Sequence, residues 1–182
     1  ATEDGVARFD ESSEQWLSVW TAGNGLPNSA DDIVYELWTN GTDLVVGTAR
    51  NQGWQGIDGE IMHLDSSGNW VSWDGGSNGI PNGYPIGMEM CGGLFHVSMN
   101  SNNGGVARFD LDTGTVESAF TTSTRLDDGN AAAVACDDAN EILYVAYHDD
   151  GEPISRYDYT NDQWLTSLTS SSHNIPSDPV WW

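Results

Sequence analysis

Lysine is absent from this 182-residue chain, and its five basic residues are all arginine. Against them stand 28 acidic residues, which give a formal net charge of −23. A surface this negative repels the phosphates of nucleic acids and anionic lipids, so we expect no nucleic acid among the partners. Long apolar runs are lacking as well. No stretch approaches the roughly 18 residues that would span a bilayer, and we expect no membrane span.

A convincing helical period is also missing. Nothing at the first residues resembles a charged region followed by an apolar signal segment, and position 1 is Ala rather than Met. We therefore expect either a processed product or a piece of a longer chain. Cysteine is scarce, and two residues of this type fit neither a disulfide-dense scaffold nor a zinc site built on paired cysteines.

What the chain does contain is an internal repeat. The hexamer GVARFD occurs verbatim at 5–10 and at 105–110, and it is echoed by GEIMHLD at 59–65 and by PISRYD at 153–158. The closing Asp returns about every 50 residues, which is the period of propeller blades. A tryptophan follows it in three of the four copies, and then comes a turn written NGLPN, NGIPN or HNIPS.

Each repeat reads as four short strands in which apolar and polar residues alternate. In the clearest copy they are 32–38, 44–49, 59–65 and 70–73, with an Asn-Gly hairpin turn between the first two. Four antiparallel strands, repeated, predict an all-β fold: a β-propeller segment of about 3.5–4 blades. A sandwich would leave the four-strand period unexplained. We expect a half blade at 1–29, blades at 30–83, 84–130 and 131–177, and the first strand of a further blade at 178–182.

The pattern LVVGT…GEIMHLDSSGNWVSW…NGIPN resembles the repeat of two-component regulator propellers. Blades of that family end in a glycine-led aromatic-Asp strand, a tryptophan strand and an Asn-Gly-Leu-Pro turn. The resemblance covers nearly the whole chain at the level of the repeat. It implies a propeller fold with a ligand-sensing or scaffolding role outside the membrane, extracellular or periplasmic, and it brings no catalytic residues.

The frame of the repeat predicts an incomplete ring, because the chain opens and closes within a blade. Such a segment has two unpaired edges, which favour aggregation unless they are covered. Either the natural protein continues, or two copies pair head to tail. We favour self-association, which would close a ring of about 7–8 blades.

Three of the five arginines occupy one repeat position: Arg8, Arg108 and Arg156, with His63 in the remaining copy. The marker Asp lies two residues further on, and therefore on the same side of the strand. A scarce cation at a repeated internal position indicates a structural ion pair or hydrogen-bond anchor rather than a catalytic group.

Loops on a rigid scaffold carry function, and in a propeller the links from strand two to three and from strand four to the next blade open on one face. We call this the loop face. The link at 49–56 combines an aromatic plane with amides and a guanidinium, which suits a sugar, although its tryptophan could equally pack beneath the loop. The candidate binding residues are Arg50, Gln52, Trp54, Gln55, Asn102, Arg125, His148 and Asp149.

The densest polar cluster is HDDGE at 148–152. The carboxylates of Asp149, Asp150 and Glu152 could take Ca²⁺, although an exposed acidic turn explains the same spacing. We expect no other cofactor. No glycine-framed serine or clustered histidine supports nucleophilic catalysis. The sequence therefore predicts a non-enzymatic module that binds a small molecule, glycan or protein; the alternative is a propeller hydrolase or lyase that uses loop-face carboxylates or His148.

Cys91 and Cys136 end the first strands of consecutive blades. Aligned positions in neighbouring blades come close near the axis, so a disulfide is geometrically conceivable. Burial as two small apolar thiols fits equally well, and we expect the thiols.

Overall fold

The computed structural model describes residues 5–22, 24–26, 32–50, 59–148 and 152–173. Within this part of the chain the structure is built from β-strands, with one four-residue helix, α1 (Ser170–His173), and one short 3-10 turn, η1 (Thr122–Thr124). No helix in the described ranges is long and apolar enough to cross a membrane.

Three four-stranded antiparallel sheets follow one another along the chain, and in each the strands pair in sequence order. The first sheet comprises β5 (Asp32–Thr39), β6 (Leu44–Arg50), β7 (Gly59–Leu64) and β8 (Trp70–Asp74). The second comprises β9 (Tyr84–Cys91), β10 (Leu94–Asn100), β11 (Gly105–Asp110) and β12 (Thr115–Phe120). The third comprises β13 (Ala131–Asp137), β14 (Ile142–Tyr147), β15 (Ile154–Asp158) and β16 (Gln163–Leu168).

A smaller unit precedes the first sheet. Strands β1 (Phe9–Asp10) and β2 (Gln15–Trp16) pair antiparallel, and a bridge between Val6 and Trp20 extends the pair. We call residues 5–20 the N-terminal hairpin. Two short parallel strands, β3 (Thr21–Ala22) and β4 (Gly25–Leu26), follow it.

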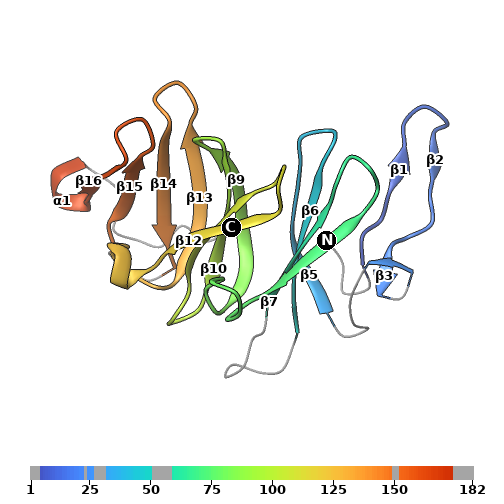
Figure 1. The fold of residues 1–182 in the computed structure, drawn as a ribbon, viewed down its shortest axis with the longest axis horizontal. Helices are drawn as coiled ribbons and strands as arrows, with labels where there is room; N and C mark the ends of the chain where they lie inside the picture. The colour runs from blue at the N-terminus through green and yellow to red at the C-terminus, as the bar shows by residue number, and fades with distance from the viewer. Residues whose placement is uncertain (1–4, 23, 27–31, 51–58, 149–151, 174–182) are drawn as a thin grey trace.

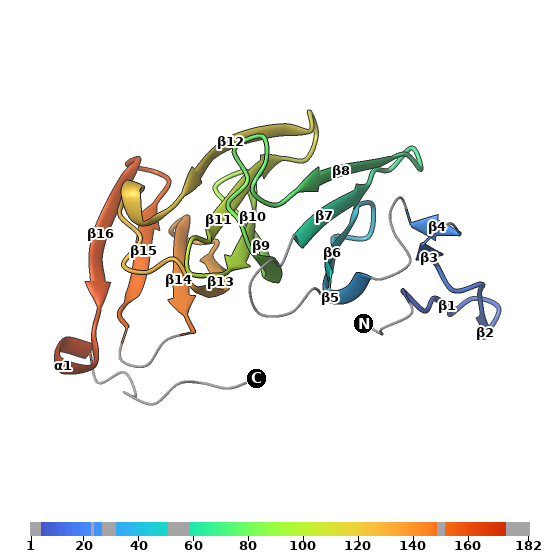
Figure 2. The same cartoon turned by 90° about the horizontal axis from the view of Figure 1, so that it is seen from below.

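The sheets stand side by side as consecutive blades, from the N-terminal hairpin at one end to the third sheet at the other (Figures 1 and 2). Strand β9 contacts both β5 and β13, so the first strands of successive sheets lie together. This arrangement confirms the predicted all-β fold of blade-like four-stranded units, a partial β-propeller.

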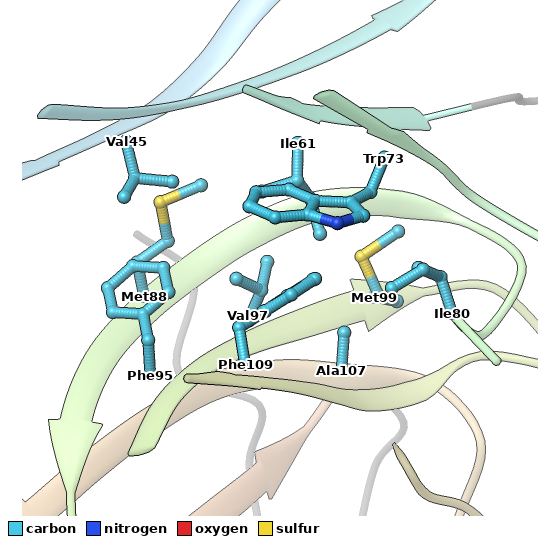
Figure 3. Close-up of a cluster of buried hydrophobic side chains, with 10 residues drawn as sticks. All are labelled: Val45, Ile61, Trp73, Ile80, Met88, Phe95, Val97, Met99, Ala107 and Phe109. Carbon is cyan, nitrogen blue, oxygen red and sulfur yellow. The ribbon is translucent and has the colours of Figure 1, made fainter. Parts of the chain in front are cut away.

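The core lies between the sheets, in three clusters. Figure 3 shows the central one, where Trp73 and Ile61 of the first sheet pack against Phe109 and neighbouring side chains of the second. A second cluster joins the second and third sheets, and a third joins the N-terminal hairpin to the first sheet. Middle strands such as β10 are buried along nearly their whole length because both of their faces meet another sheet.

The Leu-Pro turns are part of this packing. Leu26, Ile80 and Leu126, the apolar residues at equivalent turn positions, are all buried. Their recurrence therefore has a structural reason: each turn anchors the link between one sheet and the next.

Cys91 and Cys136 form a disulfide, so the expectation of two separate thiols is wrong. Because β9 and β13 lie side by side, the two Cα atoms are 5.4 Å apart, within bonding range. The bond joins the second sheet to the third and closes a loop with a sequence separation of 45 residues.

The repeated arginines act as hydrogen-bond anchors, which confirms that prediction. Arg8, Arg108 and Arg156 donate to the backbone carbonyls of Ser18, Ser118 and Thr166 respectively, each ten residues downstream. The guanidinium carbons of Arg8 and Arg108 also lie 3.9 and 4.2 Å from the centroids of the Trp20 and Phe120 rings. Each cation thus ties the third strand of its unit to the fourth.

The marker aspartates cap the turn that follows the third strand. Asp10 Oδ1 accepts hydrogen bonds from the backbone N–H and hydroxyl of Ser12, and Asp158 accepts from the backbone and side-chain amides of Asn161. These donors lower the pKa of Asp10 to about 2 and lower that of Asp158.

Candidate functional site

Two links, residues 101–104 and 121–130, meet at the loop face between the second and third sheets, and His148 joins them just past the end of β14. The His148 backbone N–H donates to the carbonyl of Asn130 at 3.0 Å. The Asn130 side-chain amide donates in turn to Asn102 Oδ1 at 3.4 Å. Gly129 permits the close approach, because a Cβ there would lie 2.8 Å from the Asn102 carbonyl oxygen.

A network of hydroxyls surrounds one carboxylate beside these links. Ser155 Oγ and Ser167 Oγ donate to Asp127 Oδ2 at 2.5 and 2.7 Å. The Tyr147 hydroxyl lies 2.5 Å from Ser155 Oγ and accepts a hydrogen bond from the Asp127 backbone N–H at 3.0 Å. We call Asp127, Tyr147, Ser155 and Ser167 the Asp127 cluster.

The topology places these four side chains at one end of one sheet. Tyr147 ends β14, Ser155 follows the first residue of β15, and Ser167 precedes the last residue of β16. Asp127 comes from the link that enters the sheet from β12. Ser155 is buried, Tyr147 and Ser167 are half-buried, and Asp127 is exposed, so the cluster runs from the interior to solvent.

Burial raises the pKa of the Tyr147 hydroxyl to about 12, although its hydrogen bond with Ser155 opposes the shift. The phenol therefore keeps its proton at neutral pH and acts as a hydrogen-bond donor and acceptor, not as a base. The Ser155 proton is held by a carboxylate. This set of groups can hold a polar ligand through hydrogen bonds, with a negative charge at its rim.

The structure brings together two of the binding residues predicted from sequence, Asn102 and His148, through their shared partner Asn130. Arg125 is exposed in the same link as Asp127 and adopts a left-handed backbone with φ of 97°. Gln52, Trp54, Gln55, Asp149 and Asp150 lie outside the described residues, and Arg50 is described only as the last residue of β6.

Glu152 is exposed and belongs to the same link as His148. Among the residues that the structure describes, no group of three or more His, Cys, Asp or Glu side chains is placed to hold a metal ion. The cation site predicted at 149–152 therefore stays a prediction.

Sequence reasoning missed the Asp127 cluster, although the repeat carried a signal for it. Asp127 stands where the other copies of the turn have Pro27 or Pro81. Ser155 takes the third-strand place of Met62 and Ala107, which are buried and apolar. Polar residues at repeat positions that are apolar in the other blades identify where this blade differs from them.

A second polar cluster is buried between the second and third sheets, away from the loop face. His96 of β10 has no exposed surface, and its Nε2 hydrogen bonds the Tyr159 hydroxyl. Burial, helped by the charge of Arg108, lowers the pKa of His96 to about 3, and burial raises that of Tyr159 to about 12. Both groups are neutral at pH 7, and their enclosure suits a structural role.

No protein-family model matches the chain, and no curated protein matches its sequence.

Proposed function

We propose that this chain is a non-enzymatic β-propeller module that binds a small molecule, glycan or protein on its loop face. The observation that carries the proposal is the Asp127 cluster. It concentrates hydroxyl and carboxylate groups at one end of the third sheet, and two of its members, Asp127 and Ser155, stand where the other blades carry proline or apolar side chains. A scaffold that needed only stability would keep an apolar residue at these repeat positions. A binding site needs polar groups that can hydrogen bond a ligand, and these replace the apolar residues in one blade.

The chemistry of the cluster favours binding over catalysis. Tyr147 holds its proton well above neutral pH, and the Ser155 hydroxyl donates to a carboxylate that already accepts from Ser167. A hydrolase or lyase that uses loop-face carboxylates or His148 is the alternative. It predicts turnover, whereas the binding module predicts saturable affinity without product.

Location and family are part of the same proposal. The resemblance to two-component regulator propellers suggests sensing or scaffolding outside the cytoplasm. The disulfide between Cys91 and Cys136 supports an extracellular or periplasmic setting, because such bonds persist in oxidising compartments. We also propose that the chain associates with a second copy, giving a closed ring of about 7–8 blades.

The test is a binding screen on glycan and small-molecule arrays, run with and without Ca²⁺ because of the acidic residues at 149–152. The variants are Asp127→Asn and Tyr147→Phe, with Trp54→Ala for the first loop. Asp138→Asn is the matched control, since Asp138 is an exposed carboxylate in the β13–β14 turn, at the opposite end of the sheet.

Binding that falls at least about tenfold in Asp127→Asn and is kept in Asp138→Asn would support the site, since a charge-assisted hydrogen bond is worth about 1.5–3 kcal/mol. Urea titration of each variant separates lost affinity from lost folding. Equal binding by all variants would refute the loop-face site, and product formation by the wild type would favour the enzymatic alternative.

A further inference from the structure

The same six residues, GVARFD, occur in two surroundings. In the second sheet, Ala107 and Phe109 have no exposed surface, because they pack against the first sheet. In the N-terminal hairpin, the equivalent Ala7 is exposed and 48% of Phe9 is exposed. Identical sequence with opposite burial shows that the hairpin presents a packing face whose counterpart is not among the described residues.

Each sheet has two faces, which we name by chain order. The leading face turns toward the following sheet, and the trailing face turns toward the preceding one. At every junction an aromatic side chain on the leading face contacts an aromatic side chain on the next trailing face. The contacts, with their ring-centroid distances, are Trp20–Trp70 at 5.8 Å, Trp73–Phe109 at 4.7 Å and Phe120–Trp164 at 4.8 Å.

The trailing face of the N-terminal hairpin has the features of these junctions. Phe9 and Trp16 are cross-strand partners whose rings lie 5.2 Å apart, as Tyr157 and Trp164 are at 5.1 Å in the third sheet. Phe120 of the second sheet contacts the latter pair. Trp16, by contrast, is 73% exposed.

The leading face of the third sheet is also less buried than the equivalent face of the second sheet. In the second sheet the leading-face residues His96, Ser98, Val106 and Phe120 are all buried. Strand pairing places Tyr144, Ala146, Ile154 and Leu168 at the equivalent positions of the third sheet, and each of these is half-buried. Both ends of the described arc thus carry junction faces made by the same repeat.

We propose that the trailing face of the N-terminal hairpin (Ala7, Phe9, Trp16) packs against the leading face of the third sheet (Tyr144, Ala146, Ile154, Leu168) in a second copy of the chain. The inference rests on the proposed self-association and specifies its surface. Leu168 holds the place that Trp73 and Phe120 hold at the internal junctions, so it meets Phe9 and Trp16 of the second copy. The interface is head to tail, and two such junctions close a two-chain ring.

The occupant is a second copy because the chain carries both halves of the junction. At each of the three internal junctions, the leading face of one repeat packs against the trailing face of the next, so the two faces fit each other. Each copy carries a net charge of −23, and the repulsion between two copies opposes their association. Salt screens this repulsion. Association is therefore expected to strengthen as the salt concentration rises, unlike that of an interface held by ion pairs.

Sedimentation equilibrium of the whole chain, from about 1 to 100 μM in low and in about 0.5 M NaCl, measures the association. Trp16→Glu and Leu168→Glu each place a charge in the interface and are expected to weaken association on the order of 100-fold. Val71→Glu is the matched control, because Val71 is 42% exposed and lies in the first sheet, outside both faces of the proposed interface. Far-UV circular dichroism and urea titration verify that each variant folds.

Mixing the two weakened variants tests the geometry. In a head-to-tail pair, an equimolar mixture of Trp16→Glu and Leu168→Glu retains one unmodified junction, and part of the association returns. A wild-type chain that stays monomeric at the highest concentration and salt overturns both this surface and the proposed self-association. A dimer that resists either substitution, or a mixture that recovers nothing, overturns this surface alone. Neither result affects the conclusion of the binding tests at the loop face, which use other variants and measure ligand binding.

Discussion

The buried imidazole of His96 makes the stability of this protein depend on pH between the unfolded and the folded pKa of that histidine. His96 lies in the middle of β10, opposite Glu89 of β9 and Arg108 of β11, and it faces Tyr159 from the third sheet. Gly92 makes room for the Tyr159 ring, since a Cβ there would lie 2.2 Å from it. A proton added to the ring would place a cation beside Arg108 in a site closed to water.

The magnitude follows from the two pKa values. In the unfolded chain the pKa of the histidine is 6.5, whereas in the folded protein it is about 3. Between these values the unfolded state binds the extra proton, so the free energy of unfolding falls by about 1.4 kcal/mol for each pH unit of acidification. The loss is about 2 kcal/mol at pH 5 and about 4 kcal/mol at pH 3, where the folded histidine is itself half protonated, against a typical total of about 5–15 kcal/mol.

Urea titrations at pH 7, 6 and 5 measure this effect by comparing the wild type with His96→Gln. Glutamine keeps a polar group near Tyr159 and does not titrate, so between pH 7 and 5 the free energy of unfolding of His96→Gln is expected to fall by about 2 kcal/mol less than that of the wild type. His173→Gln is the control for the loss of a histidine, because His173 is exposed in α1. If the free energy of unfolding changed equally with pH in the wild type and in His96→Gln, the assignment of His96 as a buried neutral imidazole would be refuted.

Three further predictions concern the packing within and between the sheets. Arg108→Ala is expected to lower the free energy of unfolding by about 1–3 kcal/mol, because it removes the hydrogen bond to a backbone carbonyl and the contact with an aromatic ring; unchanged urea stability would contradict the anchor role. Phe109→Ala is expected to cost about 3–5 kcal/mol, and Phe9→Ala less than about 1 kcal/mol in the dilute monomer; equal losses would mean that the exposure difference is wrong. Reduction of Cys91–Cys136 should add the mass of two hydrogens and cost about 4 kcal/mol for a loop of this length; a mass insensitive to reductant would refute the bond.

The sequence predicted the strands well because propeller strands are short, alternating and separated by turn residues. The predicted strand at 32–38 is β5 (Asp32–Thr39), and the one at 70–73 is β8 (Trp70–Asp74). The verbatim hexamer then fixed the frame of the repeat, and the four-stranded sheets follow that frame. Period and pattern are local properties, which a single sequence displays.

The candidate site was harder to predict because it depends on contacts between distant segments. Asn102 and His148 were chosen because they lie in loops, and they meet at Asn130, which no local pattern indicates. Ser155 was not chosen because it lies inside a strand, where a lone hydroxyl looks like an ordinary alternation. Only a comparison of repeat positions, blade by blade, would have shown that its neighbours there are apolar.

The disulfide was misjudged for a related reason. Both cysteines sit at equivalent ends of their strands, but equivalence alone leaves the separation of neighbouring blades open. The packing of β9 against β13 sets the separation, and it favours the bond over two thiols.

The same bond has a consequence for a protein exposed to proteases. Strands β10, β11 and β12 and the links at 101–104 and 121–130 all lie between Cys91 and Cys136. A single cut anywhere in this segment leaves the two fragments covalently tied, with the interlocked sheets still in register. The two links that carry Asn102 and Asp127 can thus be nicked without releasing either half, and a site near the surface gains tolerance to the proteolysis that exposed loops invite.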